Sequence, residues 1–239
     1  MRVVVTAGPT REHLDPVRFL SNPSTGKMGF AIAAEAARRG HEVVLIAGPV
    51  ALKTPKGVER VDVVSAREML ERCLDSLGGL EGLGGLEGLG GLGGLEGNNK
   101  RTTTRETVVI ATAAVADWRP AKCATKKLKK TQMSGVLKLV RNPDILKTLA
   151  KTRGRKTGDV RLVGFAAETN DVLKEAARKC REKGLEFIVA NDVTQKGSGF
   201  GTDTNKVTFV FPDGTLKKFP LMTKRLVAKK ILEEIENEK

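Results

Sequence analysis

Residues able to bind an anion gather in a loop near the start of the chain. Positions 21–29 read Ser-Asn-Pro-Ser-Thr-Gly-Lys-Met-Gly, and an apolar helical periodicity follows them as far as Gly40. The N–H groups of a helix's first turn have no intrahelical partner, and the helix dipole favours negative charge there. With a helix expected to begin at Ser24-Thr25, we predict a phosphate-binding loop formed by Ser24, Thr25, Gly26 and Lys27.

Neither common phosphate-binding motif fits this loop. A Walker A loop needs glycine where the chain has Ser21, and serine or threonine where it has Met28. A dinucleotide fingerprint needs a tight turn from strand to helix. Here about twenty residues intervene, a length typical of functional loops. The segment therefore predicts either an anion site of another kind or a helix that is merely well capped.

Three further groups of residues can do chemistry. The Asn22 amide can orient a carboxylate or hold a charged intermediate, although Asn22 also suits a plain turn before Pro23. Asp117 directly follows a predicted strand, where it can contact magnesium or a ribose, or be an ordinary turn residue. The lysine run 126–130 can neutralise charge on a leaving pyrophosphate, or be a solvated loop.

Positive charge is concentrated in one stretch of the chain. Residues 100–156 hold 16 Lys or Arg and 3 Asp or Glu, which accounts for most of the formal net charge of +14. This block favours a polyanionic partner. Because the chain has one Trp and no Tyr, platforms for base stacking are scarce, and a heavily phosphorylated small substrate explains the block at least as well as nucleic acid.

The elements that position these residues alternate between strand and helix. Strands are predicted at 2–6, 41–46, 58–64, 106–113, 135–140, 160–168 and 186–190, and a hairpin at 206–219. Ser65 with Glu68 forms a capping box. Asn142 and Asn170 are predicted helix caps, and a final helix carries Leu226, Val227, Ile231 and Ile235 on one side. The pattern predicts a mostly parallel α/β sheet with helices on both faces.

One segment falls outside this pattern. Residues 77–105 contain a repeat of leucine and glycine followed by a polar stretch. Its glycine content makes a helix entropically costly. We predict that residues 1–239 form a single domain that carries this segment as a mobile surface insert.

Composition excludes several classes of protein. The chain has no run of about 18 apolar residues, and its start reads as a strand, so we expect neither a membrane span nor a signal peptide. Three distant cysteines argue for a reducing, cytoplasmic setting. With only His13 and His41 available, a Ser-His-Asp triad or a histidine metal site is not expected.

A resemblance to a known family runs through these same residues. The ordered motifs Thr6-Ala7-Gly8-Pro9-Thr10-Arg11, Ser21-Asn22, Gly26-Lys27-Met28-Gly29, Ala113-Ala114-Val115-Ala116-Asp117, Lys127-Leu128-Lys129-Lys130, Asn142-Pro143-Asp144-Ile145, Gly164-Phe165-Ala166-Ala167-Glu168 and Ala190-Asn191-Asp192 resemble the phosphopantothenate–cysteine ligases (phosphopantothenoylcysteine synthetases) of coenzyme A synthesis, in their CTP-dependent bacterial and archaeal form. The resemblance covers nearly the whole chain except the 77–105 insert.

The resemblance implies a Rossmann-like fold and a two-step reaction. 4′-Phosphopantothenate and CTP give an acyl-cytidylate, and L-cysteine then displaces CMP. By motif, Asn22 and Lys127 would be catalytic, and Asp117 would be near magnesium (or manganese). The nucleotide site would comprise Ala111, Thr112, Ala113, Asp117, Lys127, Pro143, Asp144, Ile145, Leu146, Phe165, Lys179 and Lys183. Spacing alone makes Lys179 and Lys183 solvent-facing neighbours on a helix, so here the resemblance changes the prediction.

The family further implies a homodimer and a flavin-dependent decarboxylase, which would be a separate protein because this chain starts at the ligase strand. Two alternatives have a different chemistry. An NAD(P)-dependent oxidoreductase shares the strand–loop–helix opening but not its fingerprint, and a nucleic-acid-binding module would use the basic block. We expect neither a nucleic-acid nor a membrane partner.

Overall fold

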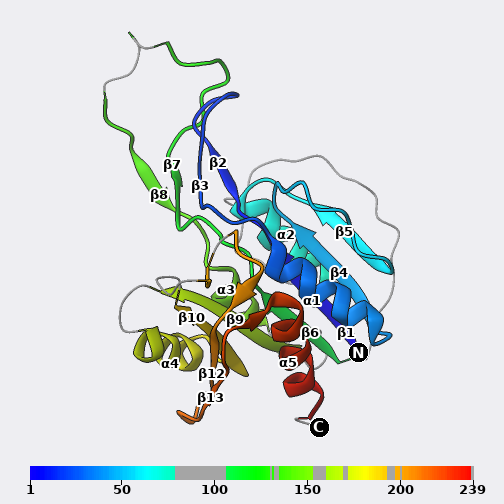
Figure 1. The fold of residues 1–239 in the computed structure, drawn as a ribbon. Coiled ribbons are helices and arrows are strands. Elements are labelled where there is room, and N and C mark those ends of the chain that lie inside the picture. Colours follow the sequence, from blue (N-terminus) through cyan, green and yellow to red (C-terminus); the bar gives the residue numbers. More distant parts are fainter. Residues whose placement is uncertain are drawn as a thin grey trace.

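The computed structural model describes residues 1–78, 106–129, 131, 135–152, 160–168, 172–192, 197–199 and 201–237. An eight-stranded sheet forms its centre, in the order β13-β12-β10-β9-β6-β1-β4-β5 (Figure 1). Its parallel strands are β1 (Arg2–Ala7), β4 (Glu42–Ala47), β5 (Val58–Asp62), β6 (Thr107–Ala111), β9 (Val160–Glu168) and β10 (Phe187–Asp192). The antiparallel strands β12 (Val207–Val210) and β13 (Leu216–Lys218) complete one edge.

The sequence of β1 explains its central position. Val3, Val4 and Val5 are fully buried, because neighbouring side chains on a strand point to opposite faces and both faces of this sheet are covered. β1 pairs with β4 on one side and with β6 on the other. The chain runs from β1 to β4 and β5 on one side and then crosses to β6 on the other side of β1, so a topological switch point lies between β1 and β6, where open α/β sheets bind ligands.

Helices cover both faces of the sheet, as Figure 1 shows. The helices α1 (Lys27–Arg38) and α5 (Lys224–Asn237) share one core cluster, and α2 (Ala66–Ser76), α3 (Ile145–Thr152) and α4 (Val172–Glu182) share the other. These layers confirm the predicted Rossmann-like α/β fold with helices on both faces and an antiparallel hairpin. Among the described helices, none is long and apolar enough to cross a membrane.

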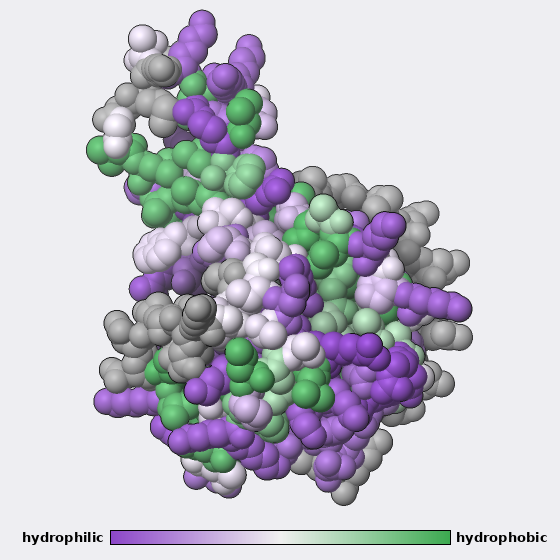
Figure 2. Space-filling model, viewed as in Figure 1, coloured by the Kyte–Doolittle hydropathy of each residue, from purple (hydrophilic) through white to green (hydrophobic). Residues whose placement is uncertain are grey.

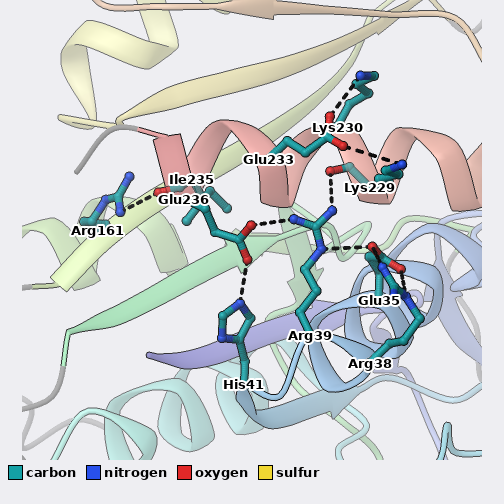
Figure 3. A network of polar contacts seen from close by, with 10 residues as sticks. All are labelled: Glu35, Arg38, Arg39, His41, Arg161, Lys229, Lys230, Glu233, Ile235 and Glu236. Atoms are coloured by element: carbon teal, nitrogen blue, oxygen red, sulfur yellow. Dashed lines mark hydrogen bonds and ion pairs between the residues drawn. The ribbon is translucent and has the colours of Figure 1, made fainter.

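A network of ion pairs joins α1 to α5 (Figure 3). Arg39 lies between Glu35 of α1 and Glu236 of α5, at 2.9 Å and 2.5 Å. His41 contacts the second oxygen of Glu236 at 2.9 Å. The hydrogen bond from Arg38, with a further one from Arg39, outweighs burial and lowers the pKa of Glu35 to about 2. The network joins α5 to the helix whose first turn lines a cavity at the carboxyl ends of the parallel strands.

Two ribbons project from the body as an arm (Figure 1). One consists of β2 (Arg11–His13) and β3 (Phe19–Ser21), and the other of β7 (Trp118–Pro120) and β8 (Leu139–Arg141). The fully buried carboxylate of Asp15 joins the ribbons, since it accepts hydrogen bonds from Arg18 and from the Leu128 amide. The Arg18 hydrogen bond, which outweighs desolvation, keeps the pKa of Asp15 well below its ordinary value.

Several local predictions are wrong at the level of single residues. α1 begins at Lys27, not at Ser24-Thr25, because Gly26 adopts φ 76° at its N-cap. The strand predicted at 135–140 is β8, which starts only at Leu139. Asn142 is not the cap of α3. Asp144 takes that role, and its Oδ1 accepts from the Lys147 amide at 3.0 Å.

Two burial predictions also need correction, while the capping box is confirmed. Leu226 is 40% exposed, because α5 buries Ala228 and Leu232 together with the other predicted positions. Leu77 is 7% exposed and belongs to the core, so it is not part of a surface insert. Ser65 accepts from the Glu68 amide at 3.3 Å. Residues 79–105 and the predicted cap Asn170 lie outside the described residues.

A small sheet of β11 (Thr204–Asn205) and β14 (Met222–Thr223) completes the fold beside the start of α1. The Asn205 Nδ2 atom lies 3.7 Å from the Met28 sulfur, and the Lys27 ammonium pairs with Asp203. The short sheet therefore packs against the first turn of α1.

Candidate active site

A cavity of about 930 Å³ opens at the carboxyl ends of the parallel strands. Its walls come from the loop before α1, the ends of β6, β9 and β10, and the start of α3. The lining residues are Thr6, Asn22, Pro23, Ser24, Thr25, Gly26, Lys27, Met28, Gly29, Ala111, Thr112, Ala113, Ala114, Val115, Ala116, Asp117, Trp118, Arg141, Asn142, Pro143, Asp144, Ile145, Leu146, Lys147, Phe165, Ala166, Lys183, Asn191, Gly199, Asn205 and Lys224.

The first turn of α1 rests directly on the ends of two strands. A side chain added at Gly29 would place its Cβ 2.5 Å from both the Ala7 Cβ and the Thr112 Oγ1. Real Cβ atoms do not come that close, so only glycine fits here. The close approach brings the unpaired first-turn N–H groups of α1 to the switch point between β1 and β6. This is a favourable position for an anion.

Asn22 is fixed by two backbone carbonyl groups. Its Nδ2 donates to Ala114 O at 3.2 Å and to Val115 O at 3.1 Å. Carbonyl oxygens only accept, which also determines which way the amide is turned. Both amide N–H groups are therefore occupied. Asn22 can donate to a bound intermediate only if it exchanges one of these bonds.

A lysine and a carboxylate lie paired at the start of α3. Lys183 Nζ is 2.8 Å from Asp144 Oδ2, and both residues line the cavity. Burial opposes the charged form of Asp144, but the hydrogen bond from Lys183 and the one from the Lys147 amide outweigh it and lower its pKa. The Asp144 carboxylate thus stays ionised at neutral pH, and Lys183 lies where it can reach a bound anion.

Asp117 fits a metal that arrives with phosphates better than a metal held by the protein alone. It is exposed in the cavity, and its carboxylate has no hydrogen-bond partner within the described ranges. Among the described residues, no group of three or more His, Cys, Asp or Glu side chains could hold a metal ion. One carboxylate combined with substrate phosphates is the usual protein setting of Mg²⁺.

The cavity carries net positive charge. Five of its lining residues are lysine or arginine, and two are aspartate. Together with the first turn of α1, these groups favour a ligand with several negative charges. The chemistry of this lining is that of anion positioning and charge neutralisation.

The structure brings together most of the residues predicted from the sequence. Asn22, all four residues of the predicted phosphate loop and every predicted nucleotide-site residue except Lys127 and Lys179 line the cavity. Lys127 is exposed on the arm, next to Leu128 at the junction of the two ribbons. Lys179 is one helical turn from Lys183 but is not part of the lining. Within this chain, then, these two lysines are not at the cavity.

Other residues of the cavity were missed as site residues. Trp118 and Arg141 pair across the β7–β8 ribbon with the guanidinium 5.3 Å from the ring centroid, and both line the entrance. Lys224 is the first residue of α5, near the C-terminal end of the chain. Periodicity alone predicts an exposed lysine at the start of this amphipathic helix. The only signal in the sequence that could have identified Lys224 is that it falls on the buried side of the helix.

The fold and the cavity define a Rossmann-like α/β domain with a positively charged candidate ligand site at the topological switch point. The sequence profile of the family described as "DNA/pantothenate metabolism flavoprotein C-terminal domain" matches residues 1–81 and 95–238. The chain belongs to this family, and the resemblance identified from the sequence is confirmed.

Individual relatives agree with this assignment. The chain is 44% identical over 234 residues to the coenzyme A biosynthesis bifunctional protein CoaBC of Bacillus subtilis, and the match covers 98% of this chain and 50% of that protein. The chain spans about half the length of the curated relatives it matches. A crystal structure of the C-terminal domain of a CoaBC protein has a TM-score of 0.74 and 39% identity, covering 99% of this chain and 94% of that one.

A more distant structure shares the fold. It is the complex of a Cab2 mutant, H337A, with phosphopantothenate-cysteine, and it has a TM-score of 0.72 at 13% identity over 99% of this chain and 86% of that one. At this identity the likeness concerns the arrangement of helices and strands alone.

Proposed function

We propose that this protein is a ligase that joins 4′-phosphopantothenate to L-cysteine with CTP, as a step of coenzyme A synthesis. The observation that carries the proposal is the cationic cavity at the switch point, in a domain 44% identical to part of a coenzyme A biosynthesis protein. The Cab2 mutant, which shares this fold, forms a complex with phosphopantothenate-cysteine, a phosphorylated amide of the proposed kind.

The reaction proceeds in two balanced steps. A carboxylate oxygen of phosphopantothenate attacks the α-phosphorus of CTP, and the bond to pyrophosphate breaks. The amine nitrogen of cysteine then attacks the acyl carbon of the acyl-cytidylate, loses a proton, and CMP leaves. Neither step needs a histidine, which fits a cavity that offers cations, amides and backbone N–H groups.

The positions of the lining residues support individual roles. The first turn of α1 with Ser24, Thr25 and Lys27 binds phosphate, and Lys183 binds the nucleotide phosphates. Asn22 exchanges one of its carbonyl bonds to hold the acyl-nucleotide. Asp117 would hold magnesium or manganese together with the substrate phosphates, and the metal would neutralise charge on them.

The arm supports the proposal of a homodimer. Its ribbons expose large apolar side chains, with Val17 57%, Phe19 39%, Leu139 39% and Val136 82% exposed. Figure 2 shows apolar surface gathered along the arm, over β7 and β8. A second copy that packs on this arm would bury these side chains. Because Lys127 lies on the arm, its proposed part in the second step depends on the position the arm takes in such an assembly.

The remaining partners are proposed from chemistry and family. The product of the ligase is a substrate for a decarboxylase, and the curated relatives are bifunctional and about twice as long. We propose that a flavin-dependent decarboxylase activity consumes the product. Cys73, Cys123 and Cys180 are free thiols, which suits the reducing cytoplasm.

A nucleotide panel tests the proposal. Purified protein with phosphopantothenate, cysteine, Mg²⁺ and CTP is expected to release CMP and pyrophosphate in equal amounts, and ATP, GTP and UTP to support less turnover. Omission of cysteine should stop CMP release. Binding of NAD(P) without any CTP effect would instead favour the oxidoreductase, and salt-sensitive binding of DNA without turnover would favour the nucleic-acid module.

A further inference from the structure

Two lysines from the starts of two helices bind one short turn at the side of the cavity. We call it the 199–203 turn. Its described residues are Gly199 and residues 201–203, and Phe200 lies outside the described residues. The first lysine, Lys27, begins α1. Its Nζ is 2.7 Å from Asp203 Oδ1 and 3.0 Å from Gly201 O. The lysine of the predicted phosphate loop is thus held on this turn.

The second lysine, Lys224, begins α5 and binds the same turn more extensively. Its Nζ donates to Thr202 O at 2.5 Å and to Gly199 O at 3.2 Å. Its backbone N–H donates to Asp203 O at 2.9 Å. Side chain and main chain of one residue therefore tie three carbonyl groups of the turn to the start of α5.

The side chain of Lys224 is charged although it lies at a buried position. It is 7% exposed, and burial together with the nearby Lys27 charge lowers its pKa. A buried ammonium is costly unless hydrogen-bonded, and two carbonyl groups provide that compensation here. Lys224 also lines the cavity. A residue kept for packing alone would not need a charge at this position.

We propose that Lys224 is a positioning residue for the anion-binding end of the cavity. It fixes the 199–203 turn, and the Asp203 and Gly201 oxygen atoms of that turn hold the ammonium of Lys27, which is the first residue of α1 and part of the cavity lining. The anion it serves is a phosphate monoester. The inference rests on the proposed function in that this anion is the phosphate of phosphopantothenate.

Steady-state kinetics of Lys224→Met give the first test. The KM for phosphopantothenate is expected to rise about tenfold, because the Lys27 ammonium loses its fixed position, a loss comparable to that of one hydrogen bond to a charged group. The KM for CTP and kcat should stay within about twofold. Arg225→Met is the matched control, since it removes an exposed cation from the same helical turn and should change none of these values.

Two readouts separate positioning from a merely structural role. The preference of the enzyme for phosphopantothenate over pantothenate, as a ratio of kcat/KM, should fall about tenfold in Lys224→Met. Equal losses on both substrates would overturn the inference. Lys27→Met should cost much less in the Lys224→Met background than in the wild type. Additive losses would show that Lys224 does not act through Lys27.

The variant Asp203→Asn tests the same inference if Lys224→Met fails to fold. The Asp203 side chain is 85% exposed, so its replacement should leave the fold intact. Loss of a negative charge by itself would tighten anion binding, whereas loss of the Lys27 anchor should weaken it. The expected result is an affinity for inorganic phosphate about fivefold weaker, measured by calorimetry. Tighter or unchanged binding would overturn the inference.

The phosphate measurement also separates the two proposals. It requires no turnover, so a wild type that binds phosphate in this Asp203-dependent way but forms no amide would refute only the proposed ligase activity. An active wild type whose Asp203→Asn and Lys224→Met variants bind phosphate normally would refute only the role of Lys224. A wild type that binds no phosphate would overturn the inference as well.

Discussion

The two hydrogen bonds of Asn22 make a quantitative prediction about the second step of the reaction. Its amide donates to Ala114 O and Val115 O at 3.2 Å and 3.1 Å. In the proposed mechanism Asn22 keeps one of these bonds and exchanges the other for a bond to the intermediate. Each contributes about 1 kcal/mol, so Asn22→Ala loses about 2 kcal/mol of positioning. If that positioning is used in the transition state, the rate of amide formation falls by about 30-fold.

Asn22→Asp is expected to be worse. A carboxylate only accepts hydrogen bonds, so at the same position its oxygens would face two carbonyl oxygens at hydrogen-bond distance. The side chain must then turn away or bring negative charge next to the intermediate. We expect a loss of more than about 100-fold in amide formation, with the acyl-cytidylate still formed and accumulating.

Rapid quenching with labelled CTP measures both species. Under saturating cysteine, the Asn22→Asp variant should show a burst of pyrophosphate and of acyl-cytidylate, followed by slow release of CMP. Asn237→Asp makes the same chemical change at the exposed end of α5 and should behave as the wild type. Normal turnover of Asn22→Asp would remove Asn22 from the mechanism, and absence of the intermediate would assign it to the first step instead.

Three further predictions concern the frame of the site. Gly29→Ala should destabilise the fold by about 1–3 kcal/mol in urea unfolding, because its Cβ would overlap Ala7 and Thr112, whereas Ala34→Ser on the exposed face of α1 should have little effect. Glu35→Gln should cost about 1–3 kcal/mol at pH 7, since the ionised form is stabilised by Arg38 and Arg39. This folded-state pKa lies below the ordinary value of 4.5, so the difference from wild type should shrink as the pH falls from about 4.5 toward 2 and be unchanged above that window. Lys183→Met should raise the KM for CTP at least about tenfold while Lys179→Met leaves it within about twofold, and equal effects of the two would contradict the cavity as the nucleotide site.

Local signals in the sequence were sufficient for the fold class. The Val3–Val5 run lies fully buried in a central strand because both faces of a parallel sheet are covered, and this burial is written in the residues themselves. The hairpin of β12 and β13 follows from its turn at Asp213-Gly214. Boundaries were harder, because Asn142 and Asp144 are both good caps, and only the contact between Asn142 Nδ2 and Ala116 O decides between them.

The sequence indicated which residue types and motifs belong to a site of this kind, and the tertiary structure decided which residues lie at the cavity. Types and spacing indicated Asn22 and Lys27, because motifs record which residues follow a strand or begin a helix, and the family resemblance added Lys183. Distance across the fold is not recorded in such patterns. The folding of the chain therefore decided that Lys127 lies on the arm, and that Lys224, nearly 200 residues after Lys27, binds the same turn as Lys27 at the side of the cavity.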